Sequence, residues 1–177
     1  MTKKKKAVAN NQASPEVFTF GDPTPVLNAY DFLYSGCWSY GSRYYEPPVD
    51  FNALAKLYRA TAHHGSALQV KRNILLRTFE PTVFLNRSNF TRLALDLLVF
   101  GNLYAEQVHS QLGRLMTIEP ALARYVRVGI KPNTYWWAHS TGEEKEFDQG
   151  AIAHIMEPDI NQEVYGVPDY IGALQSV

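Results

Sequence analysis

The residues whose types and spacing best suit metal chemistry are His154, Glu157 and Asp159. An imidazole and two carboxylates this close together in the chain could bind a divalent ion. However, Pro158 bends the backbone between the two carboxylates, and His154 is expected to alternate with core residues on a strand. A metal-dependent hydrolase or nuclease built on these three residues is therefore an alternative hypothesis. A histidine packed in the core is the simpler interpretation.

The other reactive side chains do not form a recognisable catalytic set. Cys37 lies in an aromatic, loop-rich segment without a neighbouring histidine, which favours a packed or exposed thiol over a nucleophile. His63 and His64 are adjacent, so on a helix they point about 100° apart and cannot jointly hold a metal. The sequence contains no phosphate-binding Gly-Lys-Ser/Thr loop, no Gly-x-Gly-x-x-Gly and no Gly-x-Ser-x-Gly. We predict no catalytic residue, no cofactor and no enzyme activity.

Trp136 and Trp137 form a second candidate site, for stacking on bases or sugar rings. Neighbouring residues on a strand face opposite sides, so only one of the two rings can lie on a given face. One core ring and one interface ring is the simpler interpretation. A monomeric carbohydrate- or peptide-binding module that uses the aromatic N-terminal segment and Trp136 or Trp137 is a further alternative hypothesis.

Composition limits the possible classes of protein. The 177 residues are 46% hydrophobic, enough for one globular domain. Lys+Arg and Asp+Glu both total 17, so the chain as a whole lacks the basic excess of a general nucleic-acid-binding protein. A single cysteine excludes an internal disulfide framework. No apolar stretch reaches the roughly 18 residues of a membrane span, so no membrane partner is expected.

The chain divides into three parts. Residues 1–16 are polar and basic and are expected to be a disordered tail. Residues 17–49 are rich in aromatic residues and proline and are expected to form an extended arm over another surface, either the chain's own or a neighbour's. Residues 50–177 are expected to form an α+β domain. Possible subunit-interface residues in the arm are Phe18, Phe20, Tyr44 and Tyr45.

About three helices precede the strands. Apolar spacing places them at about 50–60, 66–78 and 88–100, with a break at 63–65. Gly101 and Asn102 should end the third helix, because Gly adopts the left-handed conformation most easily and Asn next. Extended segments joined by short turns then predict a mainly antiparallel sheet. They fall at 103–109, 115–118, 125–128, 135–139, 146–147 and 151–156.

The last residues resemble the start of a further helix, with Pro168 in its first turn. This helix would extend only two to three turns before Val177. We therefore expect the chain to be the N-terminal part of a longer protein.

Five segments occur in an order that resembles the portal (head–tail connector) proteins of tailed bacteriophages. In particular they resemble the branch found in temperate contractile-tailed phages. These segments are 17–26, 44–48, 64–73, 100–102 and 157–166, and the last is the most specific. The residues taken as family-motif positions are Gly101, Asn102, Glu157, Pro158, Asp159, Asn161, Gln162, Tyr165, Gly166 and Pro168.

The resemblance implies a structural subunit of a ring, usually dodecameric, at one capsid vertex. Such a ring is a conduit for packaging and ejecting double-stranded DNA and a platform for joining head to tail. Its expected partners are copies of itself, capsid and scaffold proteins, terminase and tail proteins, first in the host cytoplasm and then in the virion. The chain has no room for the stem, clip or crown of a portal, so it would correspond to the wing. The arm would then lie on the adjacent subunit and help to close the ring.

Overall fold

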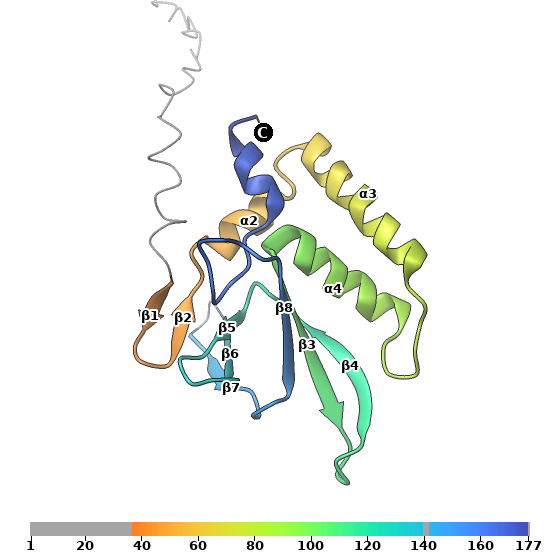
Figure 1. The fold of residues 1–177 in the computed structure, drawn as a ribbon, viewed down its shortest axis with the longest axis vertical. Helices are drawn as coiled ribbons and strands as arrows, with labels where there is room; N and C mark the ends of the chain where they lie inside the picture. The colour runs from red at the N-terminus through yellow and green to blue at the C-terminus, as the bar shows by residue number, and fades with distance from the viewer. Residues whose placement is uncertain (1–36, 140–141, 177) are drawn as a thin grey trace, which may run out of the picture.

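The computed structural model describes residues 37–139 and 142–176 (Figure 1). The basic tail, Phe18 and Phe20 lie outside the described residues. Within these residues, three α-helices come before most of the strands, as the sequence predicts, and the α+β class is confirmed. The helices are α2 (Phe51–Leu57), α3 (Ala62–Thr78) and α4 (Arg87–Phe100).

Each helix begins at a polar residue whose side chain accepts a hydrogen bond from a free backbone N–H. Asp50 caps α2, Thr61 caps α3 and Asn86 caps α4. The predicted break at 63–65 is wrong. Because Thr61 accepts from the N–H of His64, α3 starts four residues earlier than expected.

Gly65 lies inside the first turn of α3, against the end of α2. A Cβ added there would lie 3.0 Å from the carbonyl oxygen of Tyr58. Glycine at this position thus allows the two helices to approach closely, and it does not interrupt the helix.

In the part of the chain that the structure describes, the strands form three small antiparallel sheets in place of one larger sheet. The central sheet has the order β4-β3-β8, a second has the order β5-β6-β7, and β1 and β2 form a hairpin. The strands are β1 (Trp38–Tyr40), β2 (Tyr44–Glu46), β3 (Asn102–His109), β4 (Leu115–Ala121), β5 (Val126–Val128), β6 (Tyr135–Ala138), β7 (Glu144–Glu146) and β8 (Ile152–Met156).

The β1–β2 hairpin belongs to the folded domain. An isolated bridge joins Tyr44 to Gly129, just after β5, and the N–H of Ile130 donates to the carbonyl of Arg43 at 3.0 Å. Tyr44 is only 3% exposed. Residues 44–46, which the sequence places in the arm, are therefore packed against the β5-β6-β7 sheet.

The helices and the central sheet are arranged in layers. In Figure 1, α3 and α4 lie side by side as an antiparallel pair, and α4 leads directly into β3. The C-terminal element is a 3-10 helix, η1 (Asp169–Ser176), where the sequence predicts a helix after Pro168. Within the described residues, no helix is long and apolar enough to cross a membrane.

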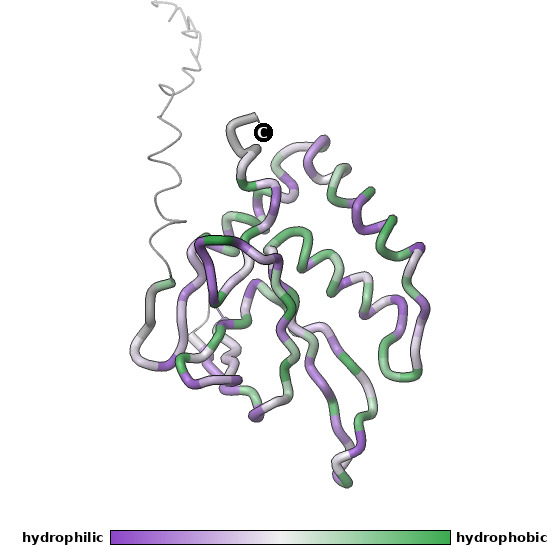
Figure 2. Tube along the Cα trace, in the orientation of Figure 1, coloured by the Kyte–Doolittle hydropathy of each residue, from purple (hydrophilic) through white to green (hydrophobic). Residues whose placement is uncertain are grey.

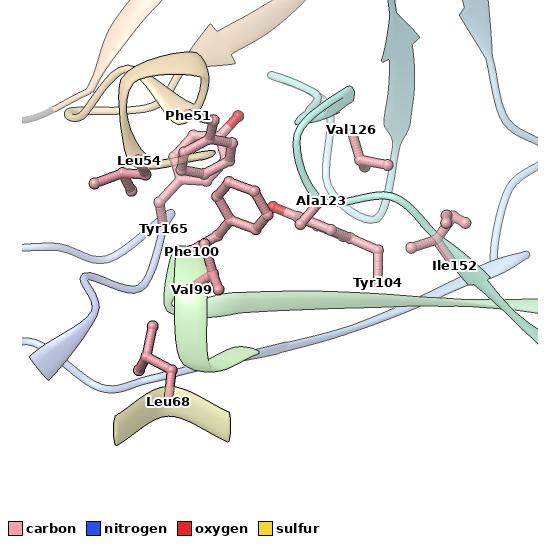
Figure 3. Packing of buried hydrophobic residues seen from close by; sticks show 11 residues of the cluster. Phe51, Leu54, Leu68, Val99, Phe100, Tyr104, Ala123, Val126, Ile152 and Tyr165 are labelled. Atoms are coloured by element: carbon pink, nitrogen blue, oxygen red, sulfur yellow. The ribbon is translucent and has the colours of Figure 1, made fainter. Parts of the chain in front are cut away.

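The hydrophobic core lies where α2, the end of α4, β3, β5 and β8 meet. Figure 2 shows apolar residues along α4, and Figure 3 shows the aromatic rings of this core. The rings of Phe51 and Phe100 lie 5.3 Å apart, and Tyr165 meets Phe51 edge-on at 6.1 Å. Each large buried side chain contributes roughly 1.5–3 kcal/mol to stability. The core thus fixes the position of the junction between α4 and β3.

Candidate functional site

Two of the segments that carry the predicted resemblance, 101–102 and 157–166, meet in the structure. Asn102 has no exposed surface. Its Nδ2 donates to the carbonyls of Phe100 and Gly166, both at 2.8 Å, and its Oδ1 accepts from the N–H of Gly166 at 2.8 Å. The sequence predicts Asn102 as a helix-ending residue, but in the structure its side chain joins two distant segments. We call this contact region the Asn102 junction.

Two glycines allow the backbones at the Asn102 junction to approach closely. Gly101 ends α4 in the left-handed conformation, with φ of 68°, as predicted. A Cβ on Gly101 would lie 2.7 Å from the backbone nitrogen of Pro168. A Cβ on Gly166 would collide with the carbonyl oxygen of Gly101, which also accepts a hydrogen bond from the N–H of Glu157 at 2.8 Å. Neither position has room for a side chain, because the added Cβ would meet the backbone of the other segment.

Tyr165 extends the junction to the second sheet. It is fully buried, its hydroxyl donates to the carbonyl of Tyr45 at 2.6 Å, and it accepts from the N–H of Val128 at 2.8 Å. Burial raises the pKa of Tyr165 well above its ordinary value, so the hydroxyl stays protonated and can donate. This one side chain therefore links β2 and β5 to the C-terminal segment.

The remaining motif residues shape the segment between β8 and the junction. Asp159 Oδ1 accepts from the N–H of Asn161 at 2.8 Å, and Asp159 bridges to Gln162 in a tight turn. Gln162 is buried, and the thiol of Cys37 donates to its Oε1 at 3.6 Å. Cys37 is half-buried, and burial raises its pKa, which disfavours the thiolate that a nucleophile needs.

His154 belongs to the junction through its imidazole. Its Nε2 lies 3.0 Å from Asn102 Oδ1, and its ring stacks on Tyr104 at 4.4 Å. Because Oδ1 can only accept, Nε2 carries the proton in this contact. Burial lowers the pKa of His154 to about 4, so the ring is neutral near pH 7.

The metal site considered from the sequence does not form. Across residues 37–139 and 142–176, no three His, Cys, Asp or Glu side chains come together as a group that could hold a metal. The imidazole of His154 is already engaged by Asn102, on the side of its Nε2. Nothing in the described structure supports the hydrolase hypothesis.

The two tryptophans on β6 face different surroundings, as a strand requires. Trp137 packs against the hydrophobic core. Trp136 lies 6.2 Å from the ring of Tyr44, and the guanidinium of Arg43 lies 5.9 Å above the Trp136 ring. Both tryptophans are partly buried by the chain's own residues. This arrangement gives the binding-module hypothesis no open aromatic platform on β6.

One buried polar residue was missed by the sequence analysis. Asp96, inside the apolar α4, is 8% exposed, and its Oδ2 accepts from the N–H of Ala123 at 2.9 Å. Burial raises its pKa to about 6, while the hydrogen bond from Ala123 lowers it. A single acid on an otherwise apolar helix face could have indicated a buried polar contact. In the structure this contact joins α4 to the segment after β4.

Comparison with solved structures defines the fold class. The chain matches a chain of the virion of the native gene transfer agent (GTA) particle with a TM-score of 0.61 and 18% identity, over 78% of this chain and 43% of that one. It matches a chain of the neck of the native GTA particle, computed with C12 symmetry, with a TM-score of 0.60 and 19% identity, over 76% and 43%. The chain therefore shares its fold with chains of the GTA particle and its neck.

Two curated proteins are similar to this chain in sequence. The chain is 49% identical over 162 residues to the probable portal protein of Escherichia phage P2, covering 91% of this chain. It is 33% identical over 138 residues to the probable portal protein of Haemophilus phage HP1 (strain HP1c1), covering 75% of this chain. The predicted resemblance to phage portal proteins is confirmed.

The chain spans 47% and 40% of the lengths of these two curated relatives. No protein-family model matches it.

Proposed function

We propose that the chain forms part of a portal subunit, a structural component of the ring at a phage capsid vertex. The similarity to the P2 probable portal protein over most of the chain carries this proposal. The fold shared with chains of the GTA particle and its neck also supports it, because that likeness is in the arrangement of helices and strands at only 18–19% sequence identity.

The subunit acts through assembly and shape, not through bond-breaking chemistry. Its buried polar groups serve the fold: Asn102, Tyr165 and Asp96 all bond to backbone groups of other segments. Such contacts suit a rigid building block, since each ties together segments that are distant in the chain. The absence of enzyme activity is part of the proposal.

The partners in this proposal follow from the portal class. Copies of the subunit form a ring, by analogy with the C12 symmetry of a similar neck structure. Double-stranded DNA passes through the ring, terminase docks during packaging in the host cytoplasm, and capsid, scaffold and tail proteins contact its outside. The mature location is the portal vertex of the virion.

Imaging the full-length protein by negative-stain electron microscopy tests this proposal. We expect rings with a central hole and a mass, measured by analytical ultracentrifugation, of about twelve subunits. A monodisperse monomer at micromolar concentration would overturn the proposal. Metal-dependent nuclease activity lost in His154→Ala would favour the hydrolase hypothesis instead.

A further inference from the structure

One face of α3 is apolar and exposed. The outer stripe of α3 consists of Ala67, Val70, Lys71, Ile74 and Leu75, whose spacing places them on one side of a helix. Val70 is 59% exposed, Ile74 58% and Leu75 36%. His64, Gly65 and Leu68, on the adjoining flank of α3, are buried in the domain. Contiguous exposed apolar side chains of this kind mark interaction sites.

A groove runs along the outer stripe. It has a volume of about 250 Å³ and is lined by Lys71, Ile74 and Leu75 of α3 and by Leu98 of α4. Its walls are apolar except for the amine of Lys71. An aromatic side chain, which buries roughly 150–250 Å² on packing, suits a groove of this kind.

The charge of α3 defines the kind of occupant further. Its 17 residues include Lys71, Arg72 and Arg77 but no Asp or Glu. Lys71 lies 3.6 Å from Asp169, and both side chains are largely exposed, so this ion pair contributes little. The complementary partner is therefore a segment that is aromatic and acidic.

Residues 17–36 of this same chain have that composition. They contain Asp22 and Asp31 and no Lys or Arg. They also contain five aromatic residues: Phe18, Phe20, Tyr30, Phe32 and Tyr34. Apolar and electrostatic complementarity thus point to one occupant for the outer stripe.

The described part of the chain begins away from α3 of its own copy, and we take a neighbouring copy as the partner. Segment 17–36 joins the domain at the β1–β2 hairpin, which lies on the opposite side from α3 (Figure 1). Twenty residues reach at most about 70 Å when fully extended. In a head-to-tail ring, two different sides of neighbouring subunits meet, so a segment that leaves one subunit at β1 can reach a side of the next subunit.

We propose that residues 17–36 of one subunit bind the outer stripe of α3 on the adjacent subunit, with an aromatic ring in the groove beside Ile74. This inference rests on the proposed ring function. It names the receptor surface of the arm, which the sequence alone did not identify.

Photo-crosslinking in the full-length protein tests this contact. Phe20 is replaced by p-benzoylphenylalanine, and 15N-labelled and unlabelled subunits are mixed before assembly. After illumination of purified rings, mass spectrometry should identify crosslinks from position 20 to the peptide containing residues 67–77, with one labelled and one unlabelled partner. Rings whose crosslinks lie elsewhere, or join only equally labelled peptides, would overturn the proposal while leaving the ring function intact.

A charge variant provides the second measurement. Ile74→Asp should lower the crosslink yield at least tenfold, because it places a carboxylate in the groove and opposite the acidic segment. Val83→Asp is the matched control, since Val83 is 92% exposed but lies outside the stripe, and it should keep the yield. Unchanged yield in Ile74→Asp would overturn the contact. Failure of all proteins, wild type included, to form rings would instead refute the proposed function.

Discussion

Asn102 binds both backbone groups of Gly166 through its side chain, although the two residues are 64 positions apart. The side-chain amide makes the same pair of hydrogen bonds that a residue of a neighbouring strand would make. Its Nδ2 donates to the C=O of Gly166 and its Oδ1 accepts from the N–H of Gly166. The segment after β8 is held in this way against the end of α4, where it makes no strand pairing.

Asn102→Ala should destabilise the protein by roughly 2–4 kcal/mol, because it leaves buried backbone groups of Gly166 and Phe100 without partners. Asn102→Asp should be similarly damaging, since an oxygen would replace Nδ2 opposite two carbonyls. Denaturant unfolding measures the loss. Asn161→Ala, at an exposed motif position, is the control and should change stability by less than about 0.5 kcal/mol. Equal losses at 102 and 161 would contradict this role for the junction.

Alanine at three glycines should separate backbone strain from steric exclusion. Gly113 has a φ of 76° with open space around it, so Gly113→Ala should cost only about 1 kcal/mol. Gly101→Ala should cost more, because it combines a positive φ with contact against Pro168. Gly166→Ala should also exceed Gly113→Ala through its collision with Gly101. Melting temperatures in the reverse order would show that the backbones at the junction move apart easily.

Tyr165→Phe should cost roughly 1–3 kcal/mol, since it removes a donor to Tyr45 and an acceptor for the Val128 N–H while keeping the ring. Tyr125→Phe is the control, on a half-buried ring just before β5 that packs beside Trp137. Thermal unfolding of both variants is the measurement. If Tyr165→Phe unfolds at the wild-type temperature, the hydroxyl does not link the sheets energetically.

The buried His154 and Asp96 should give opposing pH dependences of stability. The pKa of His154 is lowered from 6.5 to about 4, so between these values the unfolded chain binds a proton that the folded chain does not. Its contribution to stability is therefore lost as the pH falls. The pKa of Asp96 is raised from 3.8 to about 6, so here the folded chain holds the extra proton, and its contribution is lost as the pH rises.

Variants can separate the two contributions. Relative to wild type, His154→Gln should lose stability when the pH rises from 4.5 to 6, because only the Asp96 contribution remains. Asp96→Asn, which keeps an acceptor for Ala123, should gain stability over the same range. Urea unfolding at the two pH values tests both. Three parallel pH profiles would show that neither group is buried as described.

The sequence predicted what depends on neighbours along the chain. The period of α4, the left-handed Gly101 and the alternation of Trp136 and Trp137 follow from local geometry, and all three are confirmed. The start of α3 was wrong because the cap at Thr61 outweighed the expected interruption by Gly65. The sequence His63-His64-Gly65 indicated a helix break. In the structure, Gly65 instead allows α3 to pack closely against the backbone of Tyr58.

Contacts between distant segments could not be predicted in the same way. The partners of Asn102 and Asp96 lie 64 and 27 positions away, and no local pattern encodes such a pairing. The trio His154, Glu157 and Asp159 failed as a metal site for the same reason. Proximity in sequence suggested a shared ligand, but the imidazole lies against Asn102 in the interior.

The absence of any linker between α4 and β3 has a mechanical consequence. α4 ends at Phe100 and β3 begins at Asn102, so only Gly101 separates them. We therefore expect the α3–α4 pair and the β3–β4 hairpin to move together as one body. The hydrogen bonds from Asn102 to Gly166 restrain the backbone at Gly101, the residue at which the two parts could otherwise bend. A force that displaces the helices of such a subunit would therefore also displace the tip of the β3–β4 hairpin.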